Sequence, residues 1–447
     1  MENAWCFGWL LKLLHEMQYK LTQGNLDRGR LFLGTIRRLL AWRPGGYVRA
    51  SIGLFGWLLL RAAAQAVLVL ALARLLGATG YGQFVAILAV ASFFAPLVGL
   101  GLQGVVLRDG ARAPAHLPGL LGDSLALWWR AALVFGALAL FATLWLLPDG
   151  ISAYAVAAFV LAEVASSSLV DIIGRAEQAL HHSHVYGAIM AGLVFARLVA
   201  LSLLVVFDQP DVSMWLWLYA LASMLYALAL CAWTVARHRP LRTGMLRWGL
   251  VREGTSFIVG ALSFRLQAEF NKPLLAQASY SHAGNFSVAQ RVVDLASLPL
   301  QAMQEALWPR FYAGSHPPHR MRIVAGVLVV LAVLGGAALV LAAPWLSLAI
   351  GESYGPVEKM LVYLAWLPAL QVVRNLLIAA IIKRGMQSYL NWIYLIAGMA
   401  SLALNIVLVP VLGLLGAVWA LYLNEFIMSM MLLYRLNNPN GIYRRPG

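Results

Sequence analysis

About twelve long apolar runs divide the sequence, and each approaches the roughly 20 residues that a helix needs to cross a bilayer. Short polar segments separate these runs, which leaves little sequence for a soluble domain. Hydrophobic residues make up 62% of the 447 residues and charged residues only 11%. Soluble domains are much less apolar than this. We therefore expect an all-α polytopic membrane protein with helices over 51–73, 83–107, 122–147, 151–174, 185–207, 213–236, 253–275, 284–310, 321–343, 356–381, 387–409 and 413–436.

The basic residues predict on which side of the membrane each connection lies. Most of the 33 Lys and Arg residues fall in the two terminal tails and in or beside every second connection. The remaining connections contain Arg74 and Lys359, together with acidic residues such as Asp149 and Glu352. Because Lys and Arg stay in the cytoplasm during insertion, both termini are expected there. This topology explains the net charge of +15, and the scattered basic residues argue against a nucleic-acid partner.

A basic connection divides the runs into two equal sets. It has the sequence "RHRPLRTGMLRWGLVR" and covers residues 237–252. We expect one six-helix lobe over 51–236, a second over 253–436 and a cytoplasmic tail over 437–447. Residues 1–50 contain "WLLKLLHEM" followed by several arginines, which is typical of an interfacial segment on the cytoplasmic face. A disordered extension, or a start codon assigned too far upstream, would explain the same residues.

Two turns, six predicted helices apart, share a Gly-amide-Phe sequence. Gly82 and Phe84 lie where the second run begins, and Gly284 and Phe286 open the eighth. The surrounding segments are "RLLGATGYGQF", "NKPLLAQASYSHAGNFSVAQRV", "ALWPRFY" and "LNIVLVPVLGLLGAVWA". In this order and spacing they resemble oligosaccharide-lipid flippases of the Wzx type, which belong to the multidrug/oligosaccharidyl-lipid/polysaccharide exporter superfamily. The resemblance extends over about residues 51–436.

The resemblance implies two lobes around a central cavity in a bacterial inner membrane. Through this cavity an undecaprenyl-diphosphate-linked oligosaccharide would move from the cytoplasmic to the periplasmic leaflet, without a cofactor. The implied partners are this lipid-linked oligosaccharide, membrane lipids, and the polymerase and chain-length proteins of surface polysaccharide assembly. The family often carries an acid-base pair where this chain has Asn271 and Lys272. The acid is therefore either lost or displaced to Glu269.

Charged residues interrupt several apolar runs. Arg265, Glu269 and Lys272 are spaced i, i+4, i+7, so they share one helix face. A charge facing lipid is rarely tolerated, which favours a position on an aqueous cavity. An ion-pair ladder that joins the lobes is the alternative. The cations expected to bind the diphosphate are Arg61, Arg265, Lys272, Arg291 and Arg374, with Arg197 as the weakest member because it could brace its own lobe.

A polar stripe runs along the eighth predicted helix. Its members recur at i, i+4, i+7, i+11 and i+15, and they are Gln290, Asp294, Ser297, Gln301 and Glu305. Such a stripe predicts hydrogen bonds to sugar hydroxyls in the cavity, or alternatively a polar seam between helices. Buried carboxylates in the membrane are candidates for proton or cation coupling or for charge balance. Those expected to have this role are Glu163, Asp171, Glu269 and Asp294.

The remaining features argue against catalysis. No GxxxxGK[ST] phosphate loop occurs, so ATP hydrolysis is not expected. The "HHSH" segment at 181–184 is interpreted as a hydrated loop without an acidic or Cys partner, and no metal site is expected. The expected periplasmic connections are too short for the catalytic loop of a polytopic glycan polymerase or ligase. The sequence favours a transporter, either the flippase or a cation- or proton-coupled multidrug exporter of the same superfamily.

Overall fold

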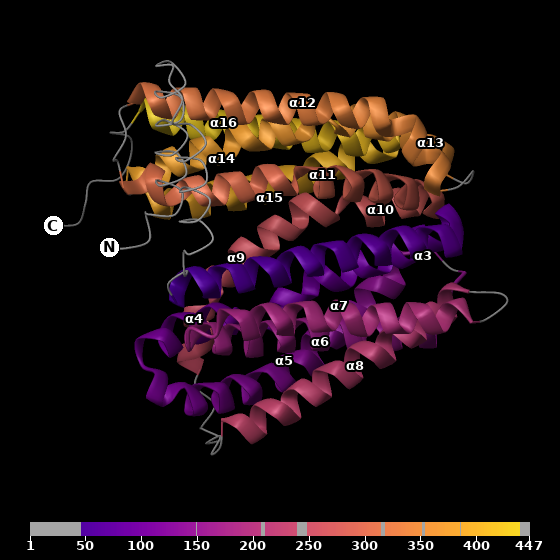
Figure 1. The fold of residues 1–447 in the computed structure, drawn as a ribbon. Coiled ribbons are helices and arrows are strands. Elements are labelled where there is room, and N and C mark those ends of the chain that lie inside the picture. Colours follow the sequence, from indigo (N-terminus) through magenta and orange to yellow (C-terminus); the bar gives the residue numbers. More distant parts are fainter. Residues whose placement is uncertain are drawn as a thin grey trace, which may run out of the picture.

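The computed structural model describes residues 46–148, 150–206, 211–238, 248–313, 318–350, 354–384 and 386–438 (Figure 1). These residues form helices and connections without a strand. The helices are α3 (Gly46–Val98), α4 (Leu102–Arg112), α5 (Leu117–Leu146), α6 (Ala153–Ala179), α7 (Ser183–Val205), α8 (Val212–Arg237), α9 (Trp248–Glu269), α10 (Asn271–Ala278), α11 (Tyr280–Ala313), α12 (Pro318–Ile350), α13 (Gly355–Leu364), α14 (Leu367–Lys383), α15 (Gln387–Leu412) and α16 (Leu414–Asn437). Nine helical spans in the described residues are long and apolar enough to cross a membrane. The expected all-α polytopic fold is confirmed.

Helix α3 contains both the first predicted helix and most of the second. Its backbone leaves the helical conformation at Gly77, where φ is 68° and ψ is 177°. A positive φ is easy for glycine and rare for other residues, so Gly77 permits a sharp turn here. The two halves of α3 run back beside each other from this turn (Figure 1). The second predicted helix ends at Val98, earlier than expected, and α4 follows it.

Two expected helices are each divided by a proline. The run 253–275 forms α9 and α10, and the run 356–381 forms α13 and α14. Proline has no N–H to bond the carbonyl four residues earlier. Pro273 therefore cannot bond Glu269, where α9 ends, and Pro368 cannot bond Leu364, where α13 ends.

The helices gather in two halves that follow the order of the chain (Figure 1). Helices α3 to α8 form the first half, and α10 to α16 form the second. Helix α9 crosses between them, since it packs against α3 and α4 as well as α15. The two halves also meet where α3 packs against α11. Helix α3 also packs against α10 and α12, so it forms most of the first half's side of this boundary.

One close contact between the halves involves the two similar Gly-amide-Phe segments found in the sequence, which were expected to be turns but lie within α3 and α11. A Cβ on Gly82 would collide with the Tyr280 carbonyl oxygen, and a Cβ on Gly284 would collide with the Ala78 carbonyl oxygen. Phe84 packs against Phe159 and Tyr219 in a hydrophobic core to which both halves contribute. The repeated glycine therefore has a steric reason, because it lets two backbones from different halves touch.

A second close contact lies near α4. A Cβ on Gly101 would collide with the Gly254 carbonyl oxygen, and a Cβ on Gly254 would collide with the Leu100 carbonyl oxygen. Arg108 of α4 also forms an ion pair with Glu253 of α9. The halves are thus held together at two separate places, one near the Gly77 turn and one near α4 (Figure 1).

Parts of the expected domain plan lie outside the described residues. These parts are residues 1–45 of the N-terminal extension, 239–247 of the basic linker and 439–447 of the tail. The boundaries at 236 and 253 stay predictions, as does the cytoplasmic position of both termini.

Candidate functional site

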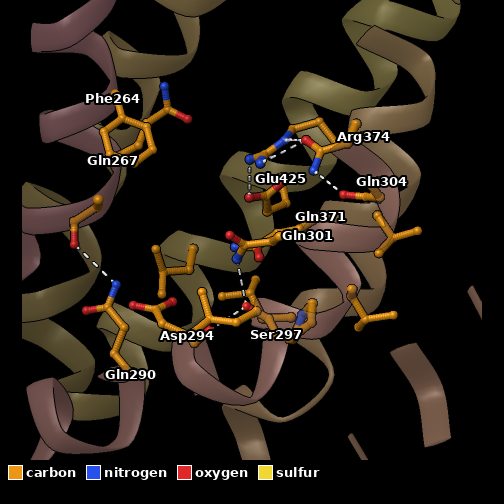
Figure 2. A pocket seen from close by; sticks show the side chains of 18 of the residues that line it. Phe264, Gln267, Gln290, Asp294, Ser297, Gln301, Gln304, Gln371, Arg374 and Glu425 are labelled. Atoms are coloured by element: carbon orange, nitrogen blue, oxygen red, sulfur yellow. Dashed lines mark hydrogen bonds and ion pairs between the residues drawn. The ribbon is translucent and has the colours of Figure 1, made fainter. Parts of the chain in front are cut away.

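A cavity of about 730 Å³ lies between α3 and the second half of the chain, and we call it the central cavity. Its wall is formed by α3, α9, α11, α14, α15 and α16. The volume falls within the roughly 300–1,000 Å³ that is usual for small-molecule sites. Polar side chains from α9, α11, α14 and α16 project toward this space (Figure 2).

The structure divides the predicted cations into different environments. Arg265, Arg291 and Arg374 line the central cavity, whereas Arg61 and Lys272 do not belong to its lining. Within the described residues, Arg265 makes no hydrogen bond or ion pair with another side chain. It is the lining arginine with the most freedom to bind an incoming anion.

The charged face that begins with Arg265 does form an ion-pair cluster. Lys272 is 2% exposed and pairs with Glu269, and the Arg291 Nη2 atom lies 3.8 Å from Glu269 Oε1. A buried ammonium needs such a partner, because an unpaired one would be too costly to desolvate. Lys272 is therefore already neutralised by Glu269, as expected for the empty site, and its role in binding the diphosphate stays a prediction. Arg291 retains a side chain that is 33% exposed.

Two further predicted site residues are Arg61 on α3 and Asp171 on α6. Arg61 and Asp171 are both exposed side chains. Asp171 is within electrostatic reach of Arg175, Arg61 and Arg265, the last of which belongs to the other half. Neither Arg61 nor Asp171 belongs to the lining of the central cavity. The role of both residues stays a prediction.

The polar stripe of α11 faces the central cavity along much of its length. Gln290, Asp294, Ser297 and Gln301 all line the cavity (Figure 2). Gln301 Nε2 donates to Ser297 Oγ at 2.8 Å, and Gln290 Nε2 donates to the Ala268 carbonyl oxygen at 3.3 Å. Glu305 lies in α11, but its side chain is outside the described part of the chain. The stripe is a cavity wall that also makes local bonds.

A network that the sequence interpretation missed lies on the opposite wall. Arg374 Nη1 of α14 donates to Glu425 Oε1 of α16 at 2.5 Å. Asn375 Nδ2 then donates to Gln304 Oε1 of α11 at 3.1 Å. Asn424 lies beside Glu425 and donates from Nδ2 to Gln267 Oε1 of α9 at 3.1 Å. The signal available in the sequence was the adjacent Asn and Glu within the last apolar run.

Glu163 and Arg197 pair inside the first half, away from the central cavity. Arg197 Nη2 donates to Glu163 Oε2 at 2.5 Å, and Tyr219 Oη donates to the same oxygen at 2.8 Å. The Arg197 guanidinium also lies over the Tyr219 ring at 4.3 Å. These bonds join α6, α7 and α8. Arg197 therefore braces its own half, and Glu163 lies in the same sealed cluster.

The histidine segment at 181–184 has a partner that was not expected. The Glu177 side chain is fully buried, and its Oε2 lies 2.9 Å from His182 Nδ1. Its Oε1 accepts from Arg237 Nε at 3.1 Å and lies 2.9 Å from His238 Nε2. The interpretation of this segment as a loop without an acidic partner was wrong. The acidic partner, Glu177, comes before the segment and lies in the last turn of α6. This cluster ties the ends of α6 and α8 to the start of α7.

No protein-family model and no curated protein sequence matches the chain. Solved structures do match it. The lipid II flippase MurJ, in an inward closed conformation, is similar with a TM-score of 0.70 and 11% identity, over 87% of each chain. An inward-facing MATE multidrug resistance transporter of the MOP superfamily has a TM-score of 0.65 and 15% identity, over 86% of this chain and 96% of its own.

The chain has a polytopic fold like that of MurJ and the MATE proteins. A third structure supports this statement, a complex of the MATE multidrug transporter DinF-BH, with a TM-score of 0.59 and 15% identity. It matches 88% of this chain and 96% of its own. At these identities the likeness shows a shared multi-pass membrane fold, and what the chain carries depends on its own cavity.

Proposed function

We propose that the chain is a flippase that moves an undecaprenyl-diphosphate-linked oligosaccharide from the cytoplasmic to the periplasmic leaflet. The observation that carries the proposal is the wall of the central cavity. It combines Arg265 and Arg291 with a row of polar side chains on α11. One part of this wall suits an anionic diphosphate, and the other suits a polyhydroxylated group.

The diphosphate is the part of such a cargo that is hardest to move through a membrane. Each of its charges would cost several kcal/mol or more if it were left unpaired in the bilayer. Arg265 makes no ion pair in the described residues, and Arg291 lies at a loose 3.8 Å from Glu269. Guanidinium groups bind phosphate oxygens through two parallel bonds. These two arginines would replace the water that the diphosphate loses.

The carboxylates at the same end would balance the arginines when the cavity is empty. Glu269 lies between Lys272 and Arg291. Asp294 lines the cavity one turn after Arg291 on α11. If Glu269 or Asp294 only balances charge, Glu269→Gln and Asp294→Asn should keep transfer. If either carboxylate couples transfer to protons, its amide should remove the effect of a pH gradient while passive exchange survives. Transfer measured with and without a gradient separates the two roles.

The test of the function is transfer in reconstituted liposomes. A fluorescent undecaprenyl-diphosphate oligosaccharide is placed in both leaflets, and a membrane-impermeant quencher reports the outer pool. We expect the protein to make the inner pool accessible, while liposomes with a similarly reconstituted unrelated membrane protein keep it protected. A rate equal to that of this control would refute the flippase function.

A multidrug exporter is the second candidate, and one observation favours it. The central cavity contains Glu269, Asp294 and Glu425 as well as its three arginines, so its carboxylates offer partners for an organic cation. The same liposomes loaded with a cationic dye test this function. Dye transport without transfer of the lipid-linked oligosaccharide would favour the exporter.

A further inference from the structure

The central cavity contains a patch of amide side chains that extends from the polar stripe of α11 to three other helices. They come from four helices and are Gln267 of α9, Gln301 and Gln304 of α11, Gln371 and Asn375 of α14, and Asn424 of α16. We call these six residues the amide wall. Figure 2 shows several of them around the Arg374–Glu425 pair. Amide side chains are polar without a charge, so the wall is suited to a polar, uncharged ligand.

The charges around the amide wall cancel. The lining of the central cavity contains Arg265, Arg291 and Arg374, and against them Glu269, Asp294 and Glu425. Arg374, which precedes Asn375 of the amide wall, forms an ion pair with Glu425 at 2.5 Å. Its charge is therefore already used. Beside the Arg374–Glu425 pair, an anionic group on a ligand would lie close to the Glu425 carboxylate.

Two members of the amide wall are anchored at one end and unpartnered at the other. Gln304 accepts a bond from Asn375 through Oε1, and its Nε2 has no partner in the described residues. Asn424 donates to Gln267 through Nδ2, and its Oδ1 has no partner there either. Both side chains are only 3% exposed. A buried polar group without a partner costs free energy, so each free end favours a ligand that satisfies it.

The free ends differ in kind, and together they favour a ligand whose groups both donate and accept hydrogen bonds. Gln304 Nε2 is a donor and Asn424 Oδ1 is an acceptor. A sugar hydroxyl both donates and accepts, so neighbouring hydroxyls satisfy the two ends together. A carboxylate can only accept, and it would leave Asn424 unpartnered. An ammonium can only donate, and it would leave Gln304 unpartnered.

We propose that the amide wall binds the sugars of the cargo and selects uncharged, hydroxyl-rich saccharides over acidic ones. This inference rests on the proposed flippase function. Arg291 and Gln304 are both on α11, and at 1.5 Å per residue they are about 20 Å apart along the helix. A diphosphate at Arg291 would therefore let several sugar units extend along the wall. The diphosphate end and the sugar end of the cavity have separate residues and separate preferences.

The experiment compares three cargoes on the same undecaprenyl-diphosphate anchor in the liposome assay. The first carries an uncharged oligosaccharide, the second has the same length with one uronic acid, and the third has no sugar. We expect the uncharged cargo to be transferred about tenfold faster than the acidic one. In the acidic cargo the uronic acid loses a buried hydrogen bond to the amide wall or brings an unpaired charge beside it. Gln304→Met and Asn424→Leu should each reduce this preference and leave transfer of the bare anchor unchanged.

Two further variants keep the test independent of folding. Gln304→Glu has nearly the same shape and adds a negative charge, so it should slow the acidic cargo further. Asn405→Leu is the matched control, because Asn405 is a fully buried amide of α15 that bonds Ser401 and does not line the central cavity. It should leave the preference unchanged. Thermal unfolding of every variant identifies any that does not fold.

The outcomes separate the two proposals. Equal transfer of uncharged and acidic cargo, or faster transfer of the acidic one, would overturn the sugar inference while the flippase function stands. Loss of the preference in Asn405→Leu but not in Gln304→Met or Asn424→Leu would overturn it as well. If the wild-type protein transfers no anchored cargo, the proposed function fails, and the inference that rests on it fails too.

Discussion

The two halves of the chain each bury an Arg–Glu pair, and the pairs have very different surroundings. In the first half Arg197 bonds Glu163, and in the second half Arg374 bonds Glu425, each with a closest N–O distance of 2.5 Å. Around the first pair, the Tyr219 ring packs under the guanidinium, and Phe159 packs on Tyr219 with ring centroids 4.8 Å apart. Around the second pair are amide side chains and the central cavity.

The comparison shows that a charge inside a membrane protein does not by itself mark a transport site. The first pair is enclosed by aromatic rings, and its bonds connect α6, α7 and α8. The second pair has an arginine that is 20% exposed, on the cavity side of α14. We expect the enclosed pair to act on stability, and the cavity residues to act on transfer.

The largest expected effect comes from breaking the enclosed pair. Arg197→Met leaves the Glu163 carboxylate buried without its cation, which should lower the free energy of unfolding by about 3–5 kcal/mol. Arg374→Met should cost less, about 1–3 kcal/mol, because Arg374 is 20% exposed on the cavity side whereas Arg197 is 11% exposed, so the removal of Arg374 opens Glu425 to the cavity. Thermal unfolding of both variants in the same detergent measures the difference. Equal losses in the two variants would show that the second pair is as enclosed as the first.

The second-largest effect concerns the rate at which the cargo is transferred, and we expect it for Arg265 and Arg291. Arg265→Gln or Arg291→Gln should slow transfer of the anchored cargo about tenfold to a hundredfold, since a hydrogen bond to a charged group contributes about 1.5–3 kcal/mol. Stability should change little, because both side chains face the cavity. Arg265→Lys should also slow transfer, since an ammonium cannot make two parallel bonds to a phosphate.

The control for the cavity arginines is Arg130. It lies on α5, where its side chain is exposed and donates to the Ala126 carbonyl oxygen, outside the lining of the central cavity. Arg130→Gln should therefore leave transfer unchanged. Wild-type transfer rates in both Arg265→Gln and Arg291→Gln would remove α9 and α11 from the diphosphate path.

A smaller effect on the free energy of unfolding is expected when a single hydrogen bond is removed, and it should be larger in the enclosed cluster than on the cavity wall. Tyr219→Phe removes the 2.8 Å bond to Glu163 Oε2, and it should cost about 1–2 kcal/mol of stability. Gln301→Met removes the 2.8 Å bond to Ser297 in a place that water can reach, and it should cost less than about 0.5 kcal/mol. Unfolding by heat or by denaturant compares the two. A larger loss for Gln301→Met would contradict the distinction.

The smallest effect is expected at the exposed ion pairs between α4 and α9. Arg108 pairs with Asp109 and with Glu253 of the other half, and these side chains are 33–47% exposed. Glu253→Gln should cost at most about 1 kcal/mol, because solvent screens exposed pairs. High salt should reduce the difference between this variant and the wild type further. A salt-independent loss of several kcal/mol would show that this contact is more enclosed than its exposure indicates.

The same contact predicts a pH dependence. The hydrogen bond from Arg108 is the main cause that lowers the pKa of Asp109 below its usual value, against the opposing effect of burial. A carboxyl with a lowered folded-state pKa stabilises the protein above its unfolded-state pKa, near 3.8, and this stabilisation disappears as pH falls through the lowered value. Asp109→Asn should remove that part of the acid dependence. Unchanged acid unfolding would show that Asp109 contributes nothing.

Much of the fold could be predicted from local patterns. Most residues of each expected apolar run are helical within the described part of the chain, because a bilayer-length apolar segment has to satisfy its backbone internally. The polar stripe of α11 could be predicted for the same reason, since side chains spaced by whole turns share a face. The divisions at Glu269 and Leu364 were missed, although Pro273 and Pro368 stood in the sequence as their cause.

The sequence by itself determined most of the helices and the face of α11 that carries Gln290 to Gln301. The chain reversal between the first two expected helices lies at Gly77, before the Gly82 segment where a turn was expected. Only the tertiary structure decided which charges are free. Lys272 is neutralised locally by Glu269, but Arg374 is neutralised by Glu425, which lies 51 residues further along the chain. The reason is physical: a helix period places a side chain on one face, whereas its partner depends on which other helix packs against that face.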